Sequence, residues 1–577
     1  MFTAAFASDH RDRDDLLTGG LGLEGLRSTL PPAFADPQRP TPGELRRRAL
    51  WSNWRGIADL APGGGFGDVY GRSGPVPGRE FHAFATLPGA SQPHRVLLQV
   101  PDAFDLRRRC LLVSASSGSR GIYGAIAVAG AWGLPRGCAV AYTDKGAGTD
   151  YVDRDAGRGV GIDGTPRALD GGMLAFAPDT TAGSGVAIKH AHSRDNPEAD
   201  WGRHVRQAAE FALQALDEAL PHAAPFTFAN TRVIAVGLSN GGGAVLRAAE
   251  LEGDWLDAVV AGEPNVFVDG HGGRSLYDYT TEAALLMPCA LLHLDGLPQP
   301  PARDQAEAAG RLRCEALQAA GVVDGVDPAA QARSAFERLR AGGWSEASIR
   351  AGALSTGFDL WRAVAATYAS AYGRFGVGEH PCGFAFAARQ TDGTPRAATA
   401  AERAAWWSDA SGIPPGAGLD LVEAGDGACV GAAPPGLQCL RALHEGSGEH
   451  ARRVRAGIDA TRASPPRQGL PVMIVHGRDD GLVPIDFSSA PYVAAAHAAG
   501  RDVRFWQVRH VQHFDAFLGL PDYGARYLPL LPYVYAALDR VEAYLDGSGP
   551  LPTDAVIAAR PRGAGVALQA DHLALPA

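Results

Sequence analysis

The sequence predicts an α/β fold with a mostly parallel central sheet, and three observations support this prediction. Short apolar runs alternate with helical patterns over residues 81–261, as in chains whose strands are joined by helices. One of these runs ends in a Gly-x-Ser-x-Gly pentapeptide, Gly237–Gly241. Far downstream, two further apolar runs are each followed by a loop with acidic or histidine side chains. Reactive side chains are therefore expected where parallel strands end.

Each element follows from its local pattern. Short apolar runs bounded by turn residues predict strands at Phe81–Thr86, Val96–Val100, Leu111–Ala115, Cys138–Tyr142, around Ile234 and at Val259–Ala261. Helical patterns predict helices at Ile122–Trp132, Gly202–Leu220 and Leu530–Leu545. The second of these helices ends at Pro221.

The pentapeptide has the sequence of a nucleophile elbow. The apolar run Val233–Leu238 leads into Ser239, and a helical pattern follows from Ala244. A serine hydroxyl attacks an acyl carbon when it protrudes from a tight turn beside a base and the amides of an oxyanion hole. Gly237 and Gly241 permit that turn, because a Cβ at either position would crowd the neighbouring strand and helix. Ser239 is therefore the predicted nucleophile of an α/β-hydrolase.

The acid is expected downstream, because this fold orders its triad as Ser, then Asp or Glu, then His. The strand-like run Leu470–Val475 leads into residues 476–484, which read His-Gly-Arg-Asp-Asp-Gly-Leu-Val-Pro. This acid-loop pattern places Asp480 at the acid position, with Asp479 as the alternative. The acid would hold the tautomer of the base and stabilise its imidazolium.

The base is expected in the loop after another strand-like run, Val503–Val508. Residues 509–515 read Arg-His-Val-Gln-His-Phe-Asp and offer two histidines. An imidazole titrates close to neutral pH, so it takes the serine proton and returns it to the leaving alcohol. We favour His513, which lies deeper in the loop, and keep His510 as the alternative.

The oxyanion hole needs two backbone amides. One belongs to the residue after the nucleophile, Asn240. The other is expected in the loop Ser116–Gly121, whose small residues let the backbone approach a ligand after the strand Leu111–Ala115. Ser119 or Gly118 is the candidate for this second donor.

Together these segments resemble the D-3-hydroxybutyrate oligomer hydrolase family of α/β-hydrolases. The resemblance covers roughly residues 95–545 and rests on Gly118–Gly124, Gly137–Gly146, Lys189–Ser193 with Asn196 and Pro197, Gly237–Gly243 and Gln512–Asp515. Of these, Tyr142–Gly146 is far more specific than any elbow. The resemblance implies hydrolysis of the ester bonds in short, water-soluble 3-hydroxybutyrate oligomers, with Ser239 as nucleophile and His513 as base.

Such a substrate ends in a free carboxylate, so a cation near the pocket would have a use. Lys145 and Arg120 are the candidate substrate-binding residues. For Lys145 the alternative is an ion pair with Asp144 that shapes the pocket.

Three other functions compete with this interpretation. Feruloyl esterases and tannases place Cys directly before the serine and directly after the histidine, whereas the neighbours here are Leu238 and Phe514. A serine exopeptidase would suit the same acid loop, and assays of ester against amide substrates would separate the two. An inactive binding protein of the same fold is disfavoured by the intact Ser, Asp and His.

The chain has 577 residues, more than a single core usually holds, so we expect a catalytic domain with an inserted part. The alternation of predicted strands and helices stops between residues 292 and 464. This segment is rich in Ala and Arg and includes the helical stretch Phe358–Tyr372. The expected organisation is an N-terminal extension packing on the core (1–75), the first part of the hydrolase domain (76–291), a large, mainly helical lid (292–464), the second part of the hydrolase domain (465–546) and a loosely held C-terminal tail (547–577).

The composition of the chain limits which kinds of partner it is expected to bind. The formal net charge is −10, and no basic cluster with interleaved aromatics is present, which argues against nucleic acid. No window approaches the ~18 apolar residues of a membrane span. His190 and His192 have a spacing that suits zinc, yet no third ligand is identifiable and triad chemistry requires no metal or cofactor. The oligomeric state stays open.

The seven cysteines are too few and scattered for a disulfide framework. We expect Cys110 and Cys138 to be buried thiols, and Cys429 with Cys439 to be able to bridge only if the enzyme is exported. The segment Met1–Asp15 has neither a basic region nor an apolar stretch of ~7–15 residues, so the chain as written is expected to be cytoplasmic. Secreted or periplasmic location is the alternative.

Overall fold

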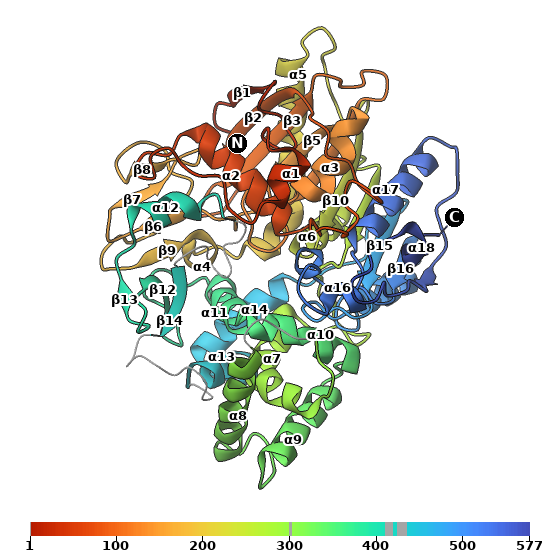
Figure 1. The fold of residues 1–577 in the computed structure, drawn as a ribbon. Coiled ribbons are helices and arrows are strands. Elements are labelled where there is room, and N and C mark those ends of the chain that lie inside the picture. Colours follow the sequence, from red (N-terminus) through yellow and green to blue (C-terminus); the bar gives the residue numbers. More distant parts are fainter. Residues whose placement is uncertain (1, 299–302, 410–418, 424–434, 577) are drawn as a thin grey trace.

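The computed structural model describes residues 2–298, 303–409, 419–423 and 435–576. Its centre is a ten-stranded sheet (Figure 1). Its strands are β1 (Phe6–His10), β2 (Gly78–Ala85), β3 (His94–Pro101), β4 (Cys110–Ala115), β5 (Ala139–Thr143), β10 (Arg232–Leu238), β11 (Ala258–Gly262), β15 (Val472–Gly477), β16 (Val503–Val508) and β17 (Ala555–Ile557). Their spatial order is β1-β2-β3-β5-β4-β10-β11-β15-β16-β17. Neighbours from β5 to β17 are parallel, and only β1, β2, β3 and β5 pair antiparallel. This confirms the predicted mostly parallel sheet.

Helices cover both faces of the sheet. One face carries α5 (Trp201–Ala219), α6 (Asn240–Ala249) and α15 (Ser489–Ala498). The other carries α2 (Pro42–Arg55), α3 (Ala131–Gly133) and α17 (Leu531–Leu545). Successive side chains of a strand point to opposite faces, so in β10 Val233 and Ala235 pack with the first set, whereas Ile234 and Val236 pack with the second. All four are fully buried, which is why this strand reads as a continuous apolar run.

The N-terminal segment lies against this core. Strand β1 pairs with β2 and extends the sheet at one edge. Trp54, near the end of α2, is fully buried, and its indole N–H donates to the carbonyl of Leu17 at 2.8 Å. Trp51 is only half-buried and donates to the carbonyl of Ser28 at 3.1 Å.

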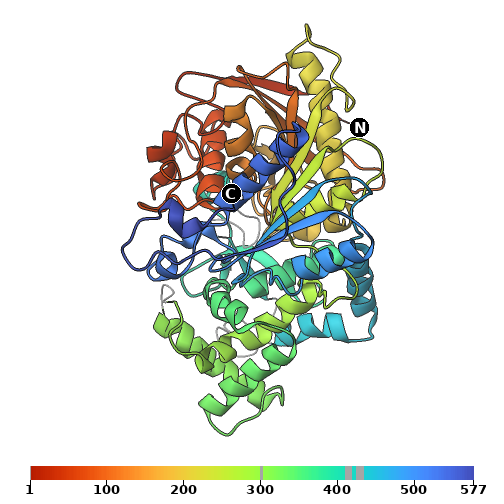
Figure 2. The ribbon, with the colours of Figure 1, turned by 90° about the vertical axis from the view of Figure 1, so that its right-hand side faces the viewer.

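Between β11 and β15, which are neighbours in the sheet, the chain forms a body of its own that we call the insertion, residues 276–460. Its elements are α7 (Leu276–Ala290), α8 (Arg303–Ala319), α9 (Pro328–Ala341), α10 (Glu346–Gly357), α11 (Leu360–Gly373), β12 (Phe384–Arg389), β13 (Pro395–Arg396), α12 (Ala400–Trp406), β14 (Leu419–Glu423), α13 (Pro435–Glu445) and α14 (Glu449–Ala460). Figures 1 and 2 show its α7–α11 gathered at one end of the molecule. Helix α7 precedes the boundary expected at 292 and packs against α9 and α11. The small sheet β13-β12-β14 was not predicted.

A second small sheet has the order β8-β7-β6-β9. Its strands are β6 (Tyr151–Asp153), β7 (Arg158–Val160), β8 (Pro166–Ala168) and β9 (Val186–Ile188). The remaining helical segments are α1 (Gly22–Arg27), η1 (Ile126–Gly130), η2 (Leu134–Arg136), α4 (Lys189–His192), η3 (Pro197–Asp200), η4 (Leu291–His293), η5 (Asp515–Phe517), α16 (Tyr523–Arg526) and α18 (Ala570–Leu573). The helix expected over Ile122–Trp132 is thus a π-helical turn, η1, that continues into α3.

The prediction of a loosely held C-terminal tail is wrong. Strand β17 pairs in parallel with β16 and forms the edge of the central sheet, with Ala555 opposite Trp506. Further on, the Tyr533 hydroxyl of α17 donates to the carbonyl of Leu573 at 2.8 Å. A three-residue strand is too short to show periodicity, so only its partner strand identifies it.

Cys110 and Cys138 are buried as predicted, but the predictions that they are free thiols and that the chain has no disulfide framework are wrong. Disulfides join Cys110 to Cys138, Cys289 to Cys314 and Cys382 to Cys439. The first pair follows from strand register: Leu111 of β4 lies opposite Ala139 of β5, so the residues that precede them also face each other. Cys439 is committed to Cys382, so it does not bridge to Cys429, which lies outside the described residues.

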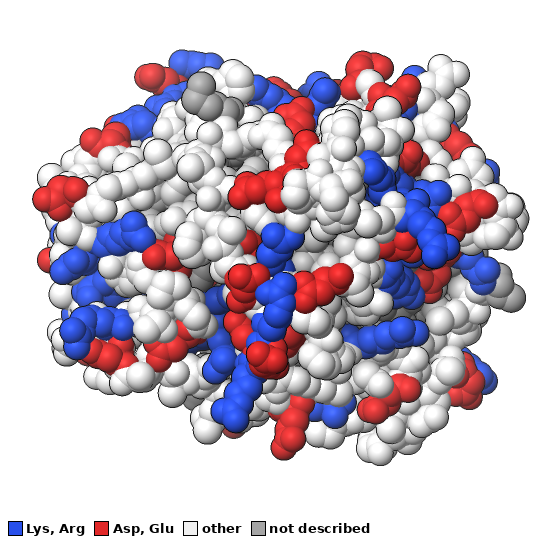
Figure 3. Space-filling view, turned by 90° about the horizontal axis from the view of Figure 1, so that it is seen from above, with Lys and Arg blue, Asp and Glu red and all other residues white. Residues whose placement is uncertain are grey.

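Among the described helices, none combines the length and apolar character that a bilayer crossing requires. On the face shown in Figure 3, acidic and basic side chains are interspersed.

Candidate active site

The elbow places Ser239 between β10 and α6. Its backbone has φ 55° and ψ −122°, a conformation that costs a non-glycine residue about 1–3 kcal/mol. Two glycines make room for it: a Cβ on Gly237 would lie 2.3 Å from the backbone of Gly241, and a Cβ on Gly241 would lie 2.4 Å from the carbonyl oxygen of Ala115. The Ser239 amide donates to the carbonyl of Gly262 at 2.9 Å, which fixes the turn to β11.

A hydrogen-bonded chain runs from this serine to a buried acid. His513 Nε2 lies 3.1 Å from Ser239 Oγ, and His513 Nδ1 lies 2.7 Å from Asp480 Oδ2. The other oxygen of Asp480 accepts from the amides of Leu482 and Val483, both at 2.7 Å. An ionised Asp480 assigns the proton to Nδ1, which leaves Nε2 to accept from the serine hydroxyl.

The electrostatics agree with an ionised acid. Burial opposes the charge of Asp480, but the His513 charge and the hydrogen bonds from His476 and His513 hold the pKa of this carboxyl well below its usual range. Asp480 is fully buried.

The two alternatives lie elsewhere in the same loops. His510 Nδ1 is 4.0 Å from Asp479 Oδ2, and the His510 side chain is 43% exposed. The structure therefore brings Ser239, His513 and Asp480 together, and the alternative histidine, His510, lies nearest to the alternative acid, Asp479.

The loop after β4 lies beside the nucleophile, as expected. Gly118, Ser119 and Asn240 line the same pocket as Ser239. Within the described residues, the backbone amides of Gly118, Ser119 and Asn240 donate to no protein acceptor. The Asn240 amide belongs to the first turn of α6, where amides have no partner inside the helix. These three amides are available to a substrate oxygen.

Lys145 does not line the pocket, which corrects its prediction as a substrate-binding residue. Its fully buried ammonium donates to Ser116 Oγ at 2.7 Å and to the carbonyl of Gly118 at 2.6 Å. Burial lowers the pKa of Lys145 to about 7, against the opposing charge of Asp144. The alternative ion pair is not formed either, because Asp144 faces Lys189 at 3.3 Å. Lys145 instead holds the loop that carries the candidate oxyanion donors.

Arg120 does line the pocket. Its Nη2 donates to the carbonyl of Gly56 at 2.8 Å, and burial lowers the pKa of the guanidinium to about 10. The two histidines considered as zinc ligands have protein partners: His190 Nδ1 lies 2.7 Å from Ser119 Oγ, and His192 Nδ1 lies 3.0 Å from the amide of Ile188.

Two buried acids that line the pocket, Glu263 and Asp515, had no role in the sequence predictions. Glu263 Oε2 lies 3.4 Å from His513 Nδ1. Asp515 accepts from the amides of Leu530 and Leu531 at 2.7 and 3.0 Å, and burial raises its pKa to about 7 against those hydrogen bonds. A signal for Glu263 existed, since it directly follows the strand beside the elbow strand.

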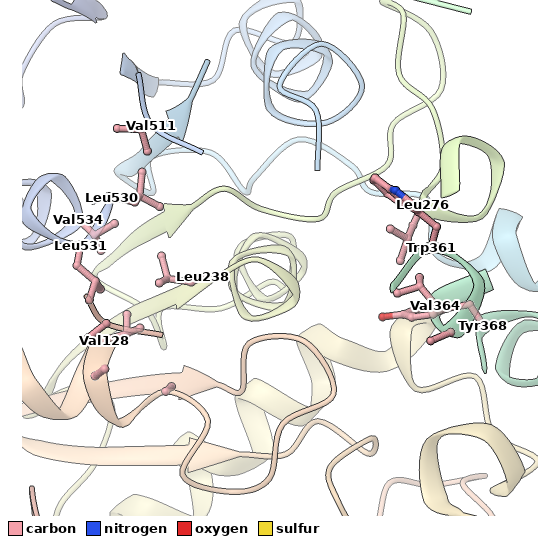
Figure 4. Close-up of a cluster of buried hydrophobic side chains, with 14 of the residues drawn as sticks. Val128, Leu238, Leu276, Trp361, Val364, Tyr368, Val511, Leu530, Leu531 and Val534 are labelled. Carbon is pink, nitrogen blue, oxygen red and sulfur yellow. The ribbon is translucent and has the colours of Figure 1, made fainter. Parts of the chain in front are cut away.

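The pocket also has a wall from the insertion. Its empty space, part of it open to solvent, is about 910 Å³. Leu276 of α7 and Leu360, Val364 and Tyr368 of α11 line it. Figure 4 shows Leu276, Val364 and Tyr368 on one side and Leu238 on the other.

The parallel sheet, the elbow and the Ser-His-Asp geometry define the class of this protein as an α/β-hydrolase. The 3HB-oligomer hydrolase family model matches residues 4–576. A D-(-)-3-hydroxybutyrate oligomer hydrolase of Paracidovorax citrulli is 40% identical over 95% of this chain and 87% of that protein. One of Azoarcus sp. is 39% identical over 97% of this chain and 90% of that protein. The chain belongs to the 3HB-oligomer hydrolase family, a family of carboxylic ester hydrolases.

Solved structures are more distant. Candida antarctica lipase A in its closed state covers 86% of this chain and 85% of its own at 11% identity and a TM-score of 0.36. Tannin acyl hydrolase from Aspergillus niger covers 86% and 82% at 12% identity and a TM-score of 0.37. The fold assignment rests on the topology described above.

Proposed function

We propose that this protein hydrolyses the ester bonds of short, soluble 3-hydroxybutyrate oligomers through an acyl-enzyme formed on Ser239. The observation that carries the proposal is the continuous chain from Ser239 Oγ through His513 to the buried Asp480. The substrate class comes from family membership and from the names of the relatives.

In the first half-reaction Ser239 Oγ attacks the ester carbonyl carbon, and His513 Nε2 takes the serine proton. The carbonyl oxygen becomes an oxyanion that accepts from the amide of Asn240 and from that of Ser119 or Gly118. As the C–O bond to the alcohol breaks, His513 gives its proton to the leaving oxygen, which departs as a hydroxyl group.

In the second half-reaction a water molecule attacks the acyl carbon, and His513 removes a proton from that water. The bond to Ser239 Oγ breaks, and the histidine returns the proton to the serine. The products are an acid and an alcohol, which for a 3-hydroxybutyrate dimer are two identical monomers. Asp480 stays ionised and balances the imidazolium in both halves.

Arg120 is the proposed partner of the substrate's terminal carboxylate. It is a cation in the lining of the pocket that holds Ser239. A charge-assisted hydrogen bond of this kind contributes roughly 1.5–3 kcal/mol, or about 10- to 150-fold in kcat/KM.

The test compares 3-hydroxybutyrate dimer with its methyl ester in the wild type, Arg120→Ala and Lys145→Ala. We expect Arg120→Ala to lower kcat/KM for the free acid by about 10- to 150-fold while changing the methyl ester much less. Lys145→Ala is the matched control: it loosens the oxyanion loop, so it lowers kcat for both substrates alike. Equal kcat/KM for acid and ester in the wild type would contradict the role of Arg120.

We further propose an oxidising compartment for this protein, either the periplasm or the exterior of the cell. Six cysteines form three disulfides in the described part of the chain, and disulfides persist where thiols are not kept reduced. Thiol labelling of the protein from fractionated cells tests this, because reactive Cys382 and Cys439 in the native host would contradict it.

A further inference from the structure

Glu263 is a buried carboxyl that the catalytic steps above do not use. It follows β11 directly, has φ 42°, and is 3% exposed. Its amide donates to the carbonyl of Val475 in β15 at 2.8 Å, so the backbone is fixed between two strands of the sheet. Glu263 thus occupies the carboxyl end of β11 as Ser239 occupies that of β10.

The carboxyl group of Glu263 faces the same ring nitrogen as the triad acid. Glu263 Oε2 lies 3.4 Å from His513 Nδ1, and Asp480 Oδ2 lies 2.7 Å from it. One oxygen of each carboxyl and one ring nitrogen all lie within 4.8 Å of one another. The other oxygen, Glu263 Oε1, is buried and has no hydrogen-bond partner among the described residues.

Hydrogen bonding decides which of the two acids carries the charge. Asp480 accepts two backbone amides through Oδ1 and faces His513 and His476 through Oδ2, the latter at 3.3 Å. Glu263 has a backbone interaction with Gly477 but no comparable set of donors among the described residues. Two buried carboxyls this close do not both ionise.

The charged and titratable groups that act on Glu263 are His513, Asp480 and Asp515, and His476 lies one step further away, 3.3 Å from Asp480 Oδ2. Burial and the charges of Asp480 and Asp515 raise the pKa of Glu263 well above its usual range. Asp480 therefore carries the negative charge, and Glu263 carries a proton.

We propose that Glu263 is a positioning residue and the second carboxyl partner of His513: neutral beside Asp480, it faces Nδ1 and orients the imidazole through the same nitrogen when the Asp480 carboxylate is removed. This inference rests on the proposed function.

A neutral second acid suits the reaction. When the serine proton reaches His513, one carboxylate balances one imidazolium. A second ionised carboxylate would make the ring hold that proton more tightly, and its return to the leaving alcohol would slow. A carboxyl that stays protonated restrains the ring without that cost.

The test is a double-mutant cycle on a soluble ester, with kcat and KM measured across pH for wild type, Glu263→Gln, Asp480→Asn and the double variant. Loss of the acid costs about 10⁴ in kcat in a serine protease triad. We expect Asp480→Asn to lose only about 10²–10³, because Glu263 ionises once its charged neighbour is gone and then orients His513. The residual rate should rise with pH as Glu263 loses its proton.

The double variant should fall at least ~10-fold below Asp480→Asn and lose that rise with pH, a coupling that contacting residues show. Glu263→Gln alone keeps a neutral side chain of similar shape beside Asp480, so it should lower kcat far less than Asp480→Asn does, with little change in KM. The matched control is Glu250→Gln, which alters a carboxyl that is 15% exposed, has a pKa raised by burial to about 7 and pairs with Arg247 outside the pocket. It should follow the wild-type pH profile.

Two outcomes overturn the inference. In the first, Asp480→Asn and the double variant have equal kcat at every pH. In the second, which needs no double variant, the downfield proton NMR signal of His513 Nδ1–H is absent from Asp480→Asn at every pH, so that Glu263 does not take over this nitrogen. A Ser239→Ala variant that keeps the wild-type turnover rate would instead overturn the proposed function. Failure of the inference about Glu263 and failure of the proposed function are therefore distinguishable.

Discussion

The two walls of the pocket differ in chemistry. The core wall consists of loops at the carboxyl ends of parallel strands and presents polar groups, among them Ser239, Ser119 and His513. The insertion wall consists of helices and presents the apolar Leu276, Leu360 and Val364 with one hydroxyl, that of Tyr368. Bond-making groups thus lie on one side and shape-determining groups on the other. Substitutions on the core wall should lower kcat, and those on the insertion wall should act mainly through KM.

The largest effect is expected on the core wall. Ser239→Ala and His513→Ala should each lower kcat by about 10⁶, because nucleophile and base act as one unit. His510→Ala is the matched control from the same loop and should retain most activity, since its partner is Asp479. Steady-state rates on a soluble ester measure all three. A dead His510→Ala with an active His513→Ala would reverse the assignment of the base.

The core wall could be predicted because its signals are local. The elbow needs glycines within two residues of Ser239, and the acid and base loops each directly follow an apolar strand. The geometry of these residues follows the prediction, whereas their catalytic roles stay predictions.

What could not be predicted depends on contacts between distant segments. The disulfide Cys110–Cys138 follows from the register of β4 on β5, and the orientation of Lys145 toward Gly118 follows from the packing of two loops. Glu263 follows a predicted strand, but its contact with His513 depends on how β11 and the later strands lie side by side in the sheet. The lining of the insertion wall likewise depends on how α7 and α11 pack, which helical periodicity does not specify.

Removing one disulfide from the core and one from the insertion should affect stability and kinetics differently. Each closes a loop, 28 residues for Cys110–Cys138 and 57 for Cys382–Cys439, and a loop of either length gives about 4 kcal/mol in the chain-entropy model. Removing the core bridge by double Cys→Ala substitution should lower the melting temperature of the whole enzyme. Removing the insertion bridge should raise KM more than it lowers kcat. Thermal unfolding and steady-state kinetics of the two variants test this, and identical kinetic changes would contradict separate roles for the walls.

Tyr368 is where the insertion wall reaches the core chemistry. Its hydroxyl accepts from Asn240 Nδ2 at 2.7 Å, and its ring packs edge-on against His190, which bonds Ser119. Tyr368→Phe leaves a buried amide without this acceptor, at a cost of about 1–3 kcal/mol. We expect kcat to fall about 10-fold with a smaller change in KM. Tyr372 lies on the same helix as Tyr368, and its hydroxyl donates to Glu198 of η3. Tyr372→Phe is therefore the control and should change kcat little.

The smallest effect is expected where the insertion touches the base loop. Phe358, between α10 and α11, stacks on Phe517 with ring centroids 4.9 Å apart, and Phe517 packs against Phe514 beside His513. An aromatic pair of this kind contributes about 0.5–1.5 kcal/mol, so Phe358→Ala should change kcat/KM by less than about 10-fold. The change should appear in KM, because the stack positions the insertion rather than the reacting atoms. Leu312→Ala is the control, since Leu312 is 48% exposed on the same insertion and Phe358 is 44% exposed. If the two variants have the same KM, the stack does not position the insertion wall.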